Sequence, residues 1–229
     1  MDKSIITISI QLDAVRAVTF DVGGTLITPW PSVGHVYAAA AARHGQVSIP
    51  PEVLNDRFVA AWHALKDFRH SRAEWAKLVD AAFVGLVEPP PSETFFPMLY
   101  DRFSEPDAWH VFDDVRPALH RLKQLGLRLA VVSNWDERLR PLLRALNLDA
   151  YFDAIIVSAE VGATKPSPII FNAVAAALGV APSAILHVGD SVEADVAGAE
   201  AAGMRALLLE RGTSSCRPDA IHSLAELQR

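Results

Sequence analysis

The chain has 229 residues, of which 51% are hydrophobic, and its formal net charge at pH 7 is −6. This length and apolar content are sufficient for a full hydrophobic core, so they exclude a largely disordered protein and fit one large domain or a core with an insertion. The negative charge argues against nucleic acid and anionic membrane surfaces as partners, and it favours a small soluble ligand.

The single cysteine and the N-terminal segment bear on where the protein works. Cys216 has no second cysteine to pair with and no His or Cys around it at metal-site spacing, which favours a reducing compartment. The apolar run Ile5–Ile10 is short, interrupted by polar residues and followed by Asp13, unlike a signal peptide or a membrane span. We therefore expect a cytoplasmic protein, monomeric or homodimeric, that binds neither membranes nor nucleic acid.

The first predicted strand of the sheet, Val15–Phe20, ends on a carboxylate. Asp21 follows it, and Gly23 and Gly24 then allow the backbone to turn sharply and to approach a ligand or a metal closely. In open α/β sheets the ligand lies beyond the carboxyl ends of the strands, where a carboxylate can attack a phosphorus or carbon centre. A plain Asp-Gly turn is the alternative interpretation of this motif taken alone.

The segment from residue 29 to residue 110 has a different pattern. It contains long helical stretches and little β pattern, with proline-rich breaks at Ile49–Pro51 and Glu88–Ser92. A packed helix face explains the alanine run Ala38–Ala42 and the stretch Phe58–Phe68. We therefore expect a core of residues 1–28 and 111–229, with residues 29–110 inserted as a helical domain.

From about residue 112 onward, short apolar runs alternate with helical patterns, as expected of crossover units on a parallel sheet. The predicted strands after the first are Leu127–Val132, Ala154–Val157, Ala184–Val188 and Ala206–Leu209. The predicted helices are Asp114–Gly126, Asp136–Leu146, Ser167–Leu178 and Glu193–Ala202. The predicted fold class is therefore α/β, a doubly wound parallel sheet with an inserted α-helical domain.

Polar residues follow the second and third predicted strands. Ser133 and Asn134 come at the end of the second strand, just before a helix, where a hydroxyl and backbone N–H groups suit an anion. Ser133 can equally be no more than the N-terminal cap of that helix. Lys165, followed by Pro166, supplies a cation at the start of the next helix, although most lysines are solvated surface charges.

Two aspartates follow the fourth predicted strand. Asp190 leaves that strand in a turn, and Asp195 lies about one turn into the next helix. Because the carboxyl ends of parallel strands meet at one edge, both are expected near Asp21, and hard oxygen ligands are what Mg²⁺ requires. The alternative is that Asp190 caps the helix and that Asp195 is a surface or pairing charge.

Taken in chain order, the polar residues after the strands resemble the ordered motifs of the haloacid dehalogenase-like (HAD) hydrolase superfamily. They are Asp21 with Thr25, then Ser133, Lys165, and Asp190 with Asp195. The resemblance covers nearly the whole chain. The helical insertion is similar to that superfamily's C1 cap, and the stretch from Trp109 to Arg211 is similar to its subfamily I, near the rhythmically-expressed-gene-like group. It implies a Rossmann-like core, a cap domain and hydrolysis of a small phosphorylated metabolite.

By position, the resemblance implies two overlapping sets of site residues. The metal-binding set comprises Asp21, which is also the nucleophile, with the backbone carbonyl of Gly23, Asp190 and Asp195. The phosphate-binding set comprises Ser133, Asn134, Gly24 and Lys165, the last of which is also counted as catalytic. Asp195 matches an acidic position that in some relatives helps to hold the metal and in others orients the lysine.

Gly23 departs from the pattern of the phosphatase members, which place there an aspartate that protonates the leaving oxygen and then activates water. Glycine retains only its carbonyl, so metal binding can persist while acid–base assistance, typically worth about 10²–10⁴-fold, is lost. We predict a Mg²⁺-dependent phosphatase that forms an aspartyl-phosphate at Asp21, slowly and with a bias toward good leaving groups. The alternative is a catalytically impaired phosphometabolite-binding or interaction protein.

The third interpretation is a phosphonatase-like C–P hydrolase, because such members place a small alanine at this position and use a cap lysine, here Lys66 or Lys77. A metal-free dehalogenase is disfavoured, because the dehalogenase members do not carry a stretch like Gly189-Asp190-Ser191. A substitute acid from the cap would be one of His35, Tyr37, His63, Asp67 and His70. An aromatic and basic group that can contact an anionic substrate, or simply pack, comprises Trp62, Arg69, Arg72 and Trp75.

Overall fold

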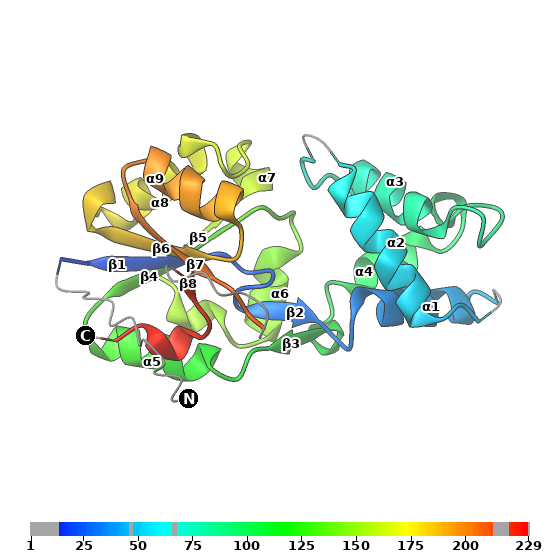
Figure 1. The fold of residues 1–229 in the computed structure, drawn as a ribbon, viewed down its shortest axis with the longest axis horizontal. Helices are drawn as coiled ribbons and strands as arrows, with labels where there is room; N and C mark the ends of the chain where they lie inside the picture. The colour runs from blue at the N-terminus through cyan, green and yellow to red at the C-terminus, as the bar shows by residue number, and fades with distance from the viewer. Residues whose placement is uncertain (1–13, 46–47, 66–67, 213–219, 229) are drawn as a thin grey trace, which may run out of the picture.

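The structure is a computed structural model that describes residues 14–45, 48–65, 68–212 and 220–228. Its core is a six-stranded parallel sheet with the strand order β5-β4-β1-β6-β7-β8 (Figure 1). The strands are β1 (Ala17–Phe20), β4 (Arg128–Ser133), β5 (Ala154–Val157), β6 (Ile185–Gly189), β7 (Arg205–Leu209) and β8 (Ala220–Ile221). Because β1 lies between β4 and β6 and is buried along its whole length, Asp21 emerges at the middle of the sheet's carboxyl edge.

Helices cover both faces of this sheet. Helices α5 (Val115–Gln124) and α6 (Leu139–Ala145) share one core cluster with Val18 and Phe20 of β1. Helix α8 (Pro168–Leu178) and the short α9 (Gly198–Ala201) form a second cluster with Ala17, on the opposite face (Figure 1). Successive residues of β1 thus point into different cores, as the pleat of a strand requires. The predicted α/β fold with a doubly wound parallel sheet is confirmed.

Most predicted elements are present, with shifted ends. The five predicted strands agree with β1, β4, β5, β6 and β7 to within two residues. The helix predicted to begin at Asp136 begins only at Leu139, because the Asp136 side chain is bonded to Arg138 in the preceding loop. The helix predicted over Glu193–Ala202 is a π-helix, Val192–Ala197, that continues into α9.

Several short elements were not predicted. Besides β8 they include the helix α7 (Ser158–Val161) and an antiparallel pair of three-residue strands, β2 (Ile27–Pro29) and β3 (Trp109–Val111). Single 3₁₀ turns lie at Pro91–Glu93, Pro106–Ala108, Asp149–Tyr151, Pro182–Ala184 and Leu224–Glu226. Segments of two or three residues are too short to show a period in the sequence.

Four helices lie between β2 and β3 and form a second body beside the sheet (Figure 1). They are α1 (Val33–Arg43), α2 (Pro51–His63), α3 (Arg72–Phe83) and α4 (Phe96–Arg102). Their boundaries follow local chemistry: Ser32 caps α1, a proline opens α2, and Ser71 with Glu74 forms a capping box at α3. A separate apolar cluster holds the four helices together.

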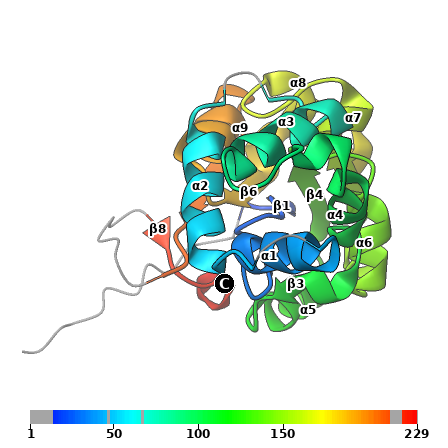
Figure 2. The same cartoon turned by 90° about the vertical axis from the view of Figure 1, so that its right-hand side faces the viewer.

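This helical body faces the sheet end-on. In Figure 2, α1–α4 stand in front of β1, β4 and β6, so that the helices lie over one end of these strands. None of the helices in the described ranges is long and apolar enough to cross a membrane.

Candidate active site

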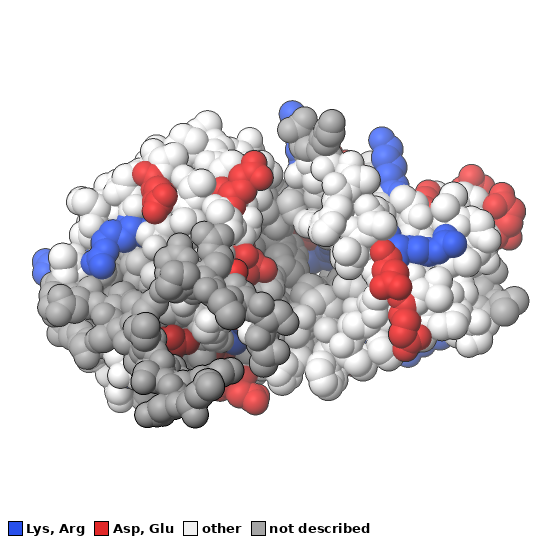
Figure 3. All heavy atoms as spheres, viewed as in Figure 1, with Lys and Arg blue, Asp and Glu red and all other residues white. Residues whose placement is uncertain are grey.

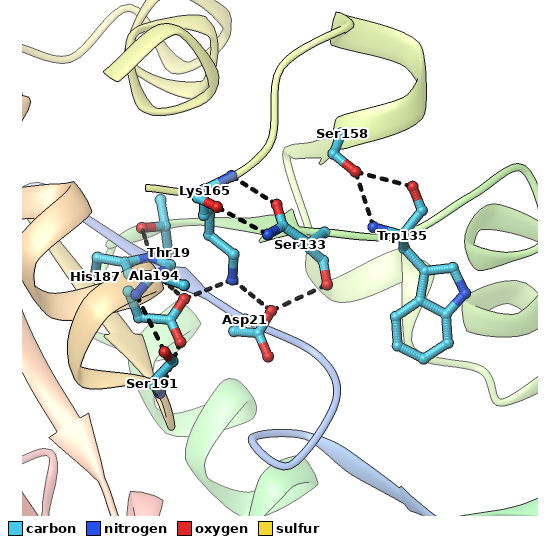
Figure 4. A network of polar contacts seen from close by, with 11 residues as sticks. Thr19, Asp21, Ser133, Trp135, Ser158, Lys165, His187, Ser191 and Ala194 are labelled. Atoms are coloured by element: carbon cyan, nitrogen blue, oxygen red, sulfur yellow. Dashed lines mark hydrogen bonds and ion pairs between the residues drawn. The ribbon is translucent and has the colours of Figure 1, made fainter. Parts of the chain in front are cut away.

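Asp21 is held at the centre of a buried polar network. Its backbone N–H donates to the carbonyl of Val188 on β6, which fixes the residue at the strand end. One carboxylate oxygen, Oδ1, accepts hydrogen bonds from Ser133 Oγ at 3.0 Å and from Lys165 Nζ at 2.6 Å (Figure 4). The three residues come from the turn after β1, the end of β4 and the loop before α8, so the fold brings Asp21 to two side chains that are more than 100 positions away in the sequence.

Lys165 is shared between two carboxylates. Its Nζ also donates to Asp195 Oδ1 at 2.5 Å, and Asp195 in turn contacts His187 Nε2 at 3.1 Å. The other ring nitrogen of His187 lies 2.9 Å from Thr19 Oγ1 (Figure 4). Thr19 and His187 were missed in the sequence, although each is a polar residue inside an apolar strand, and that interruption was the available signal.

The charges within this network offset the cost of burial. Burial lowers the pKa of Lys165, but Asp21 and Asp195 outweigh it and raise that pKa above its usual value. Burial raises the pKa of Asp195, but Lys165 and His187 reverse the effect and hold it well below the usual range. For Asp21, burial dominates over the attraction of Lys165, and its pKa is raised. Lys165 is therefore a permanent cation in a site that is rich in carboxylates.

Asp190 completes a cluster of three carboxylates. Asp21, Asp190 and Asp195 can each place a carboxylate oxygen within 4.8 Å of the others. The Asp190 residue is exposed as a whole, but its carboxylate lies beside Gly24, where a Cβ would overlap it. Burial, followed by the charges of Asp21 and Asp195, raises the pKa of Asp190 to about 7. Among the described residues, no other residue donates a hydrogen bond to this carboxylate, so it is free to take a cation.

Two alternatives for these residues are wrong. Ser133 does not cap the following helix, because α6 begins six residues later, at Leu139. Asp190 does not cap its helix either, since the hydroxyl of Ser191 accepts from the N–H of Ala194 and fills that role. Asp195 is a pairing charge, as one alternative had it, but a buried one.

Asn134 and Gly24 lie at the site in different roles. The Asn134 side chain accepts from the Lys165 N–H at 2.7 Å and donates to the Lys165 carbonyl at 3.1 Å, so both of its polar atoms hold the backbone of the lysine. Gly24 has φ +76° and turns the chain three residues after Asp21. The Arg211 guanidinium fixes this turn by donating to the Thr25 carbonyl at 2.8 and 3.0 Å.

A cavity of about 560 Å³ opens in front of Asp21, between the sheet and the helical body. Figure 3 shows the surface hollowed between these two bodies. Its floor is polar and is lined by Asp21, Ser133, Asn134, Lys165, Asp190 and Asp195. Its walls carry rings from both bodies: Tyr37, Phe58, Trp62, Trp75, Phe96, Tyr100, Phe103, Trp109 and Trp135.

Direct contacts join the helical body to the loop after Ser133. Asp136 is bound by Arg138 through two nitrogens, at 2.6 and 2.8 Å, and accepts from Trp75 Nε1 at 2.9 Å. Arg138 also donates to the Tyr100 carbonyl, and its guanidinium lies 3.5 Å from the centre of the Tyr100 ring. This buried ion pair therefore anchors α3 and α4 over the site.

The structure separates the predicted helical-domain candidates. Tyr37 and His70 line the cavity, whereas His35 and His63 do not, and Asp67 lies outside the described residues. Burial raises the pKa of Tyr37 above its usual value and lowers that of His70 to about 4.

The predicted aromatic and basic group is divided in the same way. Trp62 and Trp75 line the cavity, but Arg69 and Arg72 do not. Arg72 packs instead over the Tyr100 ring, at 4.8 Å. Of the two lysines required for phosphonatase chemistry, Lys77 is exposed and does not line the cavity, and Lys66 lies outside the described residues. The described part of the chain gives the phosphonatase interpretation no support.

Comparisons with known proteins agree with this geometry. The family model for haloacid dehalogenase-like hydrolases matches residues 15–203. Haloacid dehalogenase-like hydrolase domain-containing protein 3 of Mus musculus is 34% identical over 205 residues, covering 85% of this chain and 82% of that protein. Phosphoglycolate phosphatase of Chromobacterium violaceum is 30% identical and covers 95% and 96% of the two chains. A HAD phosphatase from Thermococcus onnurineus has a similar structure, with a TM-score of 0.67, 29% identity and coverage of 93% and 96%. The chain therefore belongs to the haloacid dehalogenase-like hydrolase family.

Proposed function

We propose that the protein is a Mg²⁺-dependent phosphatase that transfers a phosphoryl group from a small phosphorylated metabolite to Asp21 and then to water. One observation carries this proposal. The Asp21 carboxylate lies at the floor of a cavity, with a hydroxyl and an ammonium bonded to it and a further carboxylate, Asp190, beside it. These groups are the ones that a carboxylate nucleophile acting on a phosphate requires.

Lys165 and Ser133 are assigned to the transferred group. Both donate to Asp21 Oδ1, so both also lie where the oxygens of a phosphoryl group attacked by Asp21 would be. Asp195 and Asn134 act on Lys165: the first compensates its charge and the second fixes its backbone. Asp195 and Asn134 are therefore positioning residues in this proposal, and not direct ligands of metal or phosphate.

The donor set fits Mg²⁺. Asp21, Asp190 and the Gly23 carbonyl are hard oxygen ligands, and no backbone hydrogen bond of the described turn ends on that carbonyl. Both oxygens of Asp195 already accept hydrogen bonds, from Lys165, His187 and the Ser191 N–H, which leaves it less suited to a metal. When bound, Mg²⁺ would neutralise negative charge on the phosphoryl oxygens and on the carboxylates.

The reaction has two displacements. Asp21 forms a bond to phosphorus while the bond between phosphorus and the leaving oxygen breaks, and the leaving group departs with its electron pair. Water then attacks the aspartyl-phosphate, which releases phosphate and restores the carboxylate. Position 23 offers no side chain to donate or to accept a proton in either step. Substrates whose leaving group is stable as an anion, such as aryl and acyl phosphates, are therefore the favoured class.

The helical body is assigned the role of a cap. In this proposal residues 29–110 close the cavity over the substrate and exclude water, held by the contacts of Asp136 and Arg138 with Trp75 and Tyr100. The names of two similar proteins, phosphoglycolate phosphatase and HAD phosphatase, support a phosphatase activity.

Phosphate release tests the proposal directly. Purified protein with Mg²⁺ is expected to release phosphate from 4-nitrophenyl phosphate and acetyl phosphate, and far more slowly from glycerol phosphate. Chelation of the metal and the Asp21→Asn variant should each abolish release. An absence of release from all three substrates would refute the proposal.

The second candidate function is a phosphometabolite-binding protein without turnover, and Gly23 is the observation that favours it. It predicts that calorimetry detects binding of Mg²⁺ and phosphate to a protein that releases no phosphate from any substrate. Turnover at the rate of an ordinary phosphatase would exclude it.

A further inference from the structure

The wall of the cavity is far more apolar than a small phosphorylated acid requires. The Trp62 ring stacks with two other rings, those of Phe58 and Trp75, each with its centroid 6.0 Å away and its plane inclined by 26°. Trp62 is also 39% exposed, although it is a large apolar side chain. Cavities of about 300–1,000 Å³ hold drug-sized ligands, so about 560 Å³ leaves room well beyond a phosphate.

The same wall offers no unpaired positive charge among the described residues. The cations that line the cavity are Lys165 and Arg138. Lys165 is bonded to Asp21 and Asp195, and Arg138 is bonded to Asp136. His70, which also lines the wall, has its pKa lowered to about 4 by burial, so it is uncharged at neutral pH. A second anionic group on the substrate would be desolvated there without a partner.

We propose that this cavity selects phosphorylated compounds whose leaving group is an uncharged, apolar body of at least the size of an aromatic ring. The inference rests on the proposed function for the phosphate end of the substrate and adds the class of the leaving group. It separates this chain from a phosphatase of small phosphorylated carboxylic acids, which would need a cation on the cavity wall.

The absence of an acid at Gly23 points to the same class for an independent reason, because aryl and acyl leaving groups need little protonation. A substrate comparison must therefore separate the fit of the apolar body from the ease of departure. Benzoyl phosphate and acetyl phosphate form such a pair, since benzoic and acetic acid have similar strength and only one carries a ring.

Binding is measured first, because it does not depend on turnover. Calorimetry with Mg²⁺ should show benzylphosphonate binding at least about tenfold more tightly than methylphosphonate, which corresponds to about 1.4 kcal/mol. Phosphonoacetate, which adds a carboxylate instead of a ring, should bind no more tightly than methylphosphonate. The Trp62→Ala variant should lose most of the benzyl preference. Trp30→Ala is the matched control, because Trp30 is 53% exposed and does not line the cavity.

Turnover is measured second. The value of kcat/KM for benzoyl phosphate should exceed that for acetyl phosphate by about tenfold or more, and Trp62→Ala should reduce this ratio. Equal affinities for the benzyl and methyl compounds, tighter binding of phosphonoacetate, or no measurable binding of benzylphosphonate would overturn the inference. Selective benzylphosphonate binding without phosphate release from any substrate would support the inference and refute the proposed phosphatase. Phosphate release from benzoyl and acetyl phosphate with equal kcat/KM would support the proposed phosphatase and refute the inference about the leaving group.

Discussion

Restoring a carboxylate at position 23 is the most informative change to this site. Gly23 does not have a positive φ, and a Cβ there would lie 3.4 Å from Trp135 Cζ3, which is an ordinary van der Waals distance. The Cβ of an aspartate can therefore be introduced without strain in the backbone and without displacing the Trp135 ring. Asp21, Ser133 and Lys165 are not altered by this substitution.

The expected size of the gain depends on the leaving group. A positioned general acid typically contributes about 10²–10⁴-fold, or about 2.7–5.4 kcal/mol of the activation barrier at 1.36 kcal/mol per tenfold. Gly23→Asp should therefore raise kcat/KM for glycerol phosphate, whose alkoxide leaves poorly, by about 10²-fold or more, because kcat/KM reports the displacement that expels the leaving group. For acetyl phosphate, whose leaving group needs no proton, the first step should gain little.

The assay is phosphate release with Mg²⁺ at substrate concentrations well below KM, which gives kcat/KM for both substrates and for three proteins. Gly23→Asn is the control, because asparagine has the size and the polarity of aspartate but is neither an acid nor a base at neutral pH. The ratio of kcat/KM for glycerol phosphate to kcat/KM for acetyl phosphate should rise in Gly23→Asp alone. If the aspartate variant gains no more than the asparagine variant, the missing acid is not what limits this enzyme.

Three further changes test the framework of the site. Gly24→Ala should weaken Mg²⁺ binding and lower the free energy of unfolding, because its Cβ would overlap the Asp190 carboxylate. Gly126→Ala is the control, because Gly126 has the same φ of +76° but open space around the Cβ position. It should cost only about 1–2 kcal/mol of stability and leave Mg²⁺ titrations unchanged. Asp136→Ala leaves the buried Arg138 unpaired and should destabilise the fold by about 3–5 kcal/mol in urea unfolding. Asp107→Ala is the control, because Asp107 pairs with Arg102 at the surface, and its loss should cost less than about 1 kcal/mol. The folded-state pKa of His70 is lowered from 6.5 to about 4, so its contribution to stability is complete above pH 6.5 and is lost as the pH falls toward 4. Urea unfolding should show up to about 3 kcal/mol of this loss in the wild type and less in His70→Asn, which tolerates the φ of 62° at this position.

The sheet and the edge that carries the candidate site could be predicted because each rests on a local signal. A buried parallel strand reads as a largely apolar run, and Ala17–Phe20 and Ile185–Gly189 are of this kind, each with one polar residue inside it. The topology then places the residues that follow each strand at one edge. The positions of Asp21, Ser133 and Asp190 at this edge could be predicted without further information, because each residue comes directly after or at the end of such a run.

The partners of these residues could not be predicted, because their contacts depend on side-chain directions in three dimensions. Asp195 was expected beside a metal on the basis of its type and spacing, yet both of its oxygens are taken by hydrogen-bond donors. The link from Asp136 to Trp75 joins residues 61 positions apart, and neither residue carries a motif. Trp62 and Trp75 were singled out in the sequence as contacts of an anionic substrate, but their place in an aromatic cavity wall depends on how the helices pack, which no single periodic segment encodes.

The glycines of the site differ in whether packing allows them a side chain, and this bears on the missing acid at position 23. Gly24 and Gly189 are required by packing, because a Cβ at the first would overlap the carboxylate of Asp190 and a Cβ at the second that of Asp195. Gly23 is under no such constraint, since its own Cβ would find ordinary contact distances. A Cβ therefore fits at position 23, so contact at that atom does not require the glycine. In the proposed mechanism, a leaving group that departs as an anion makes an acid at this position dispensable.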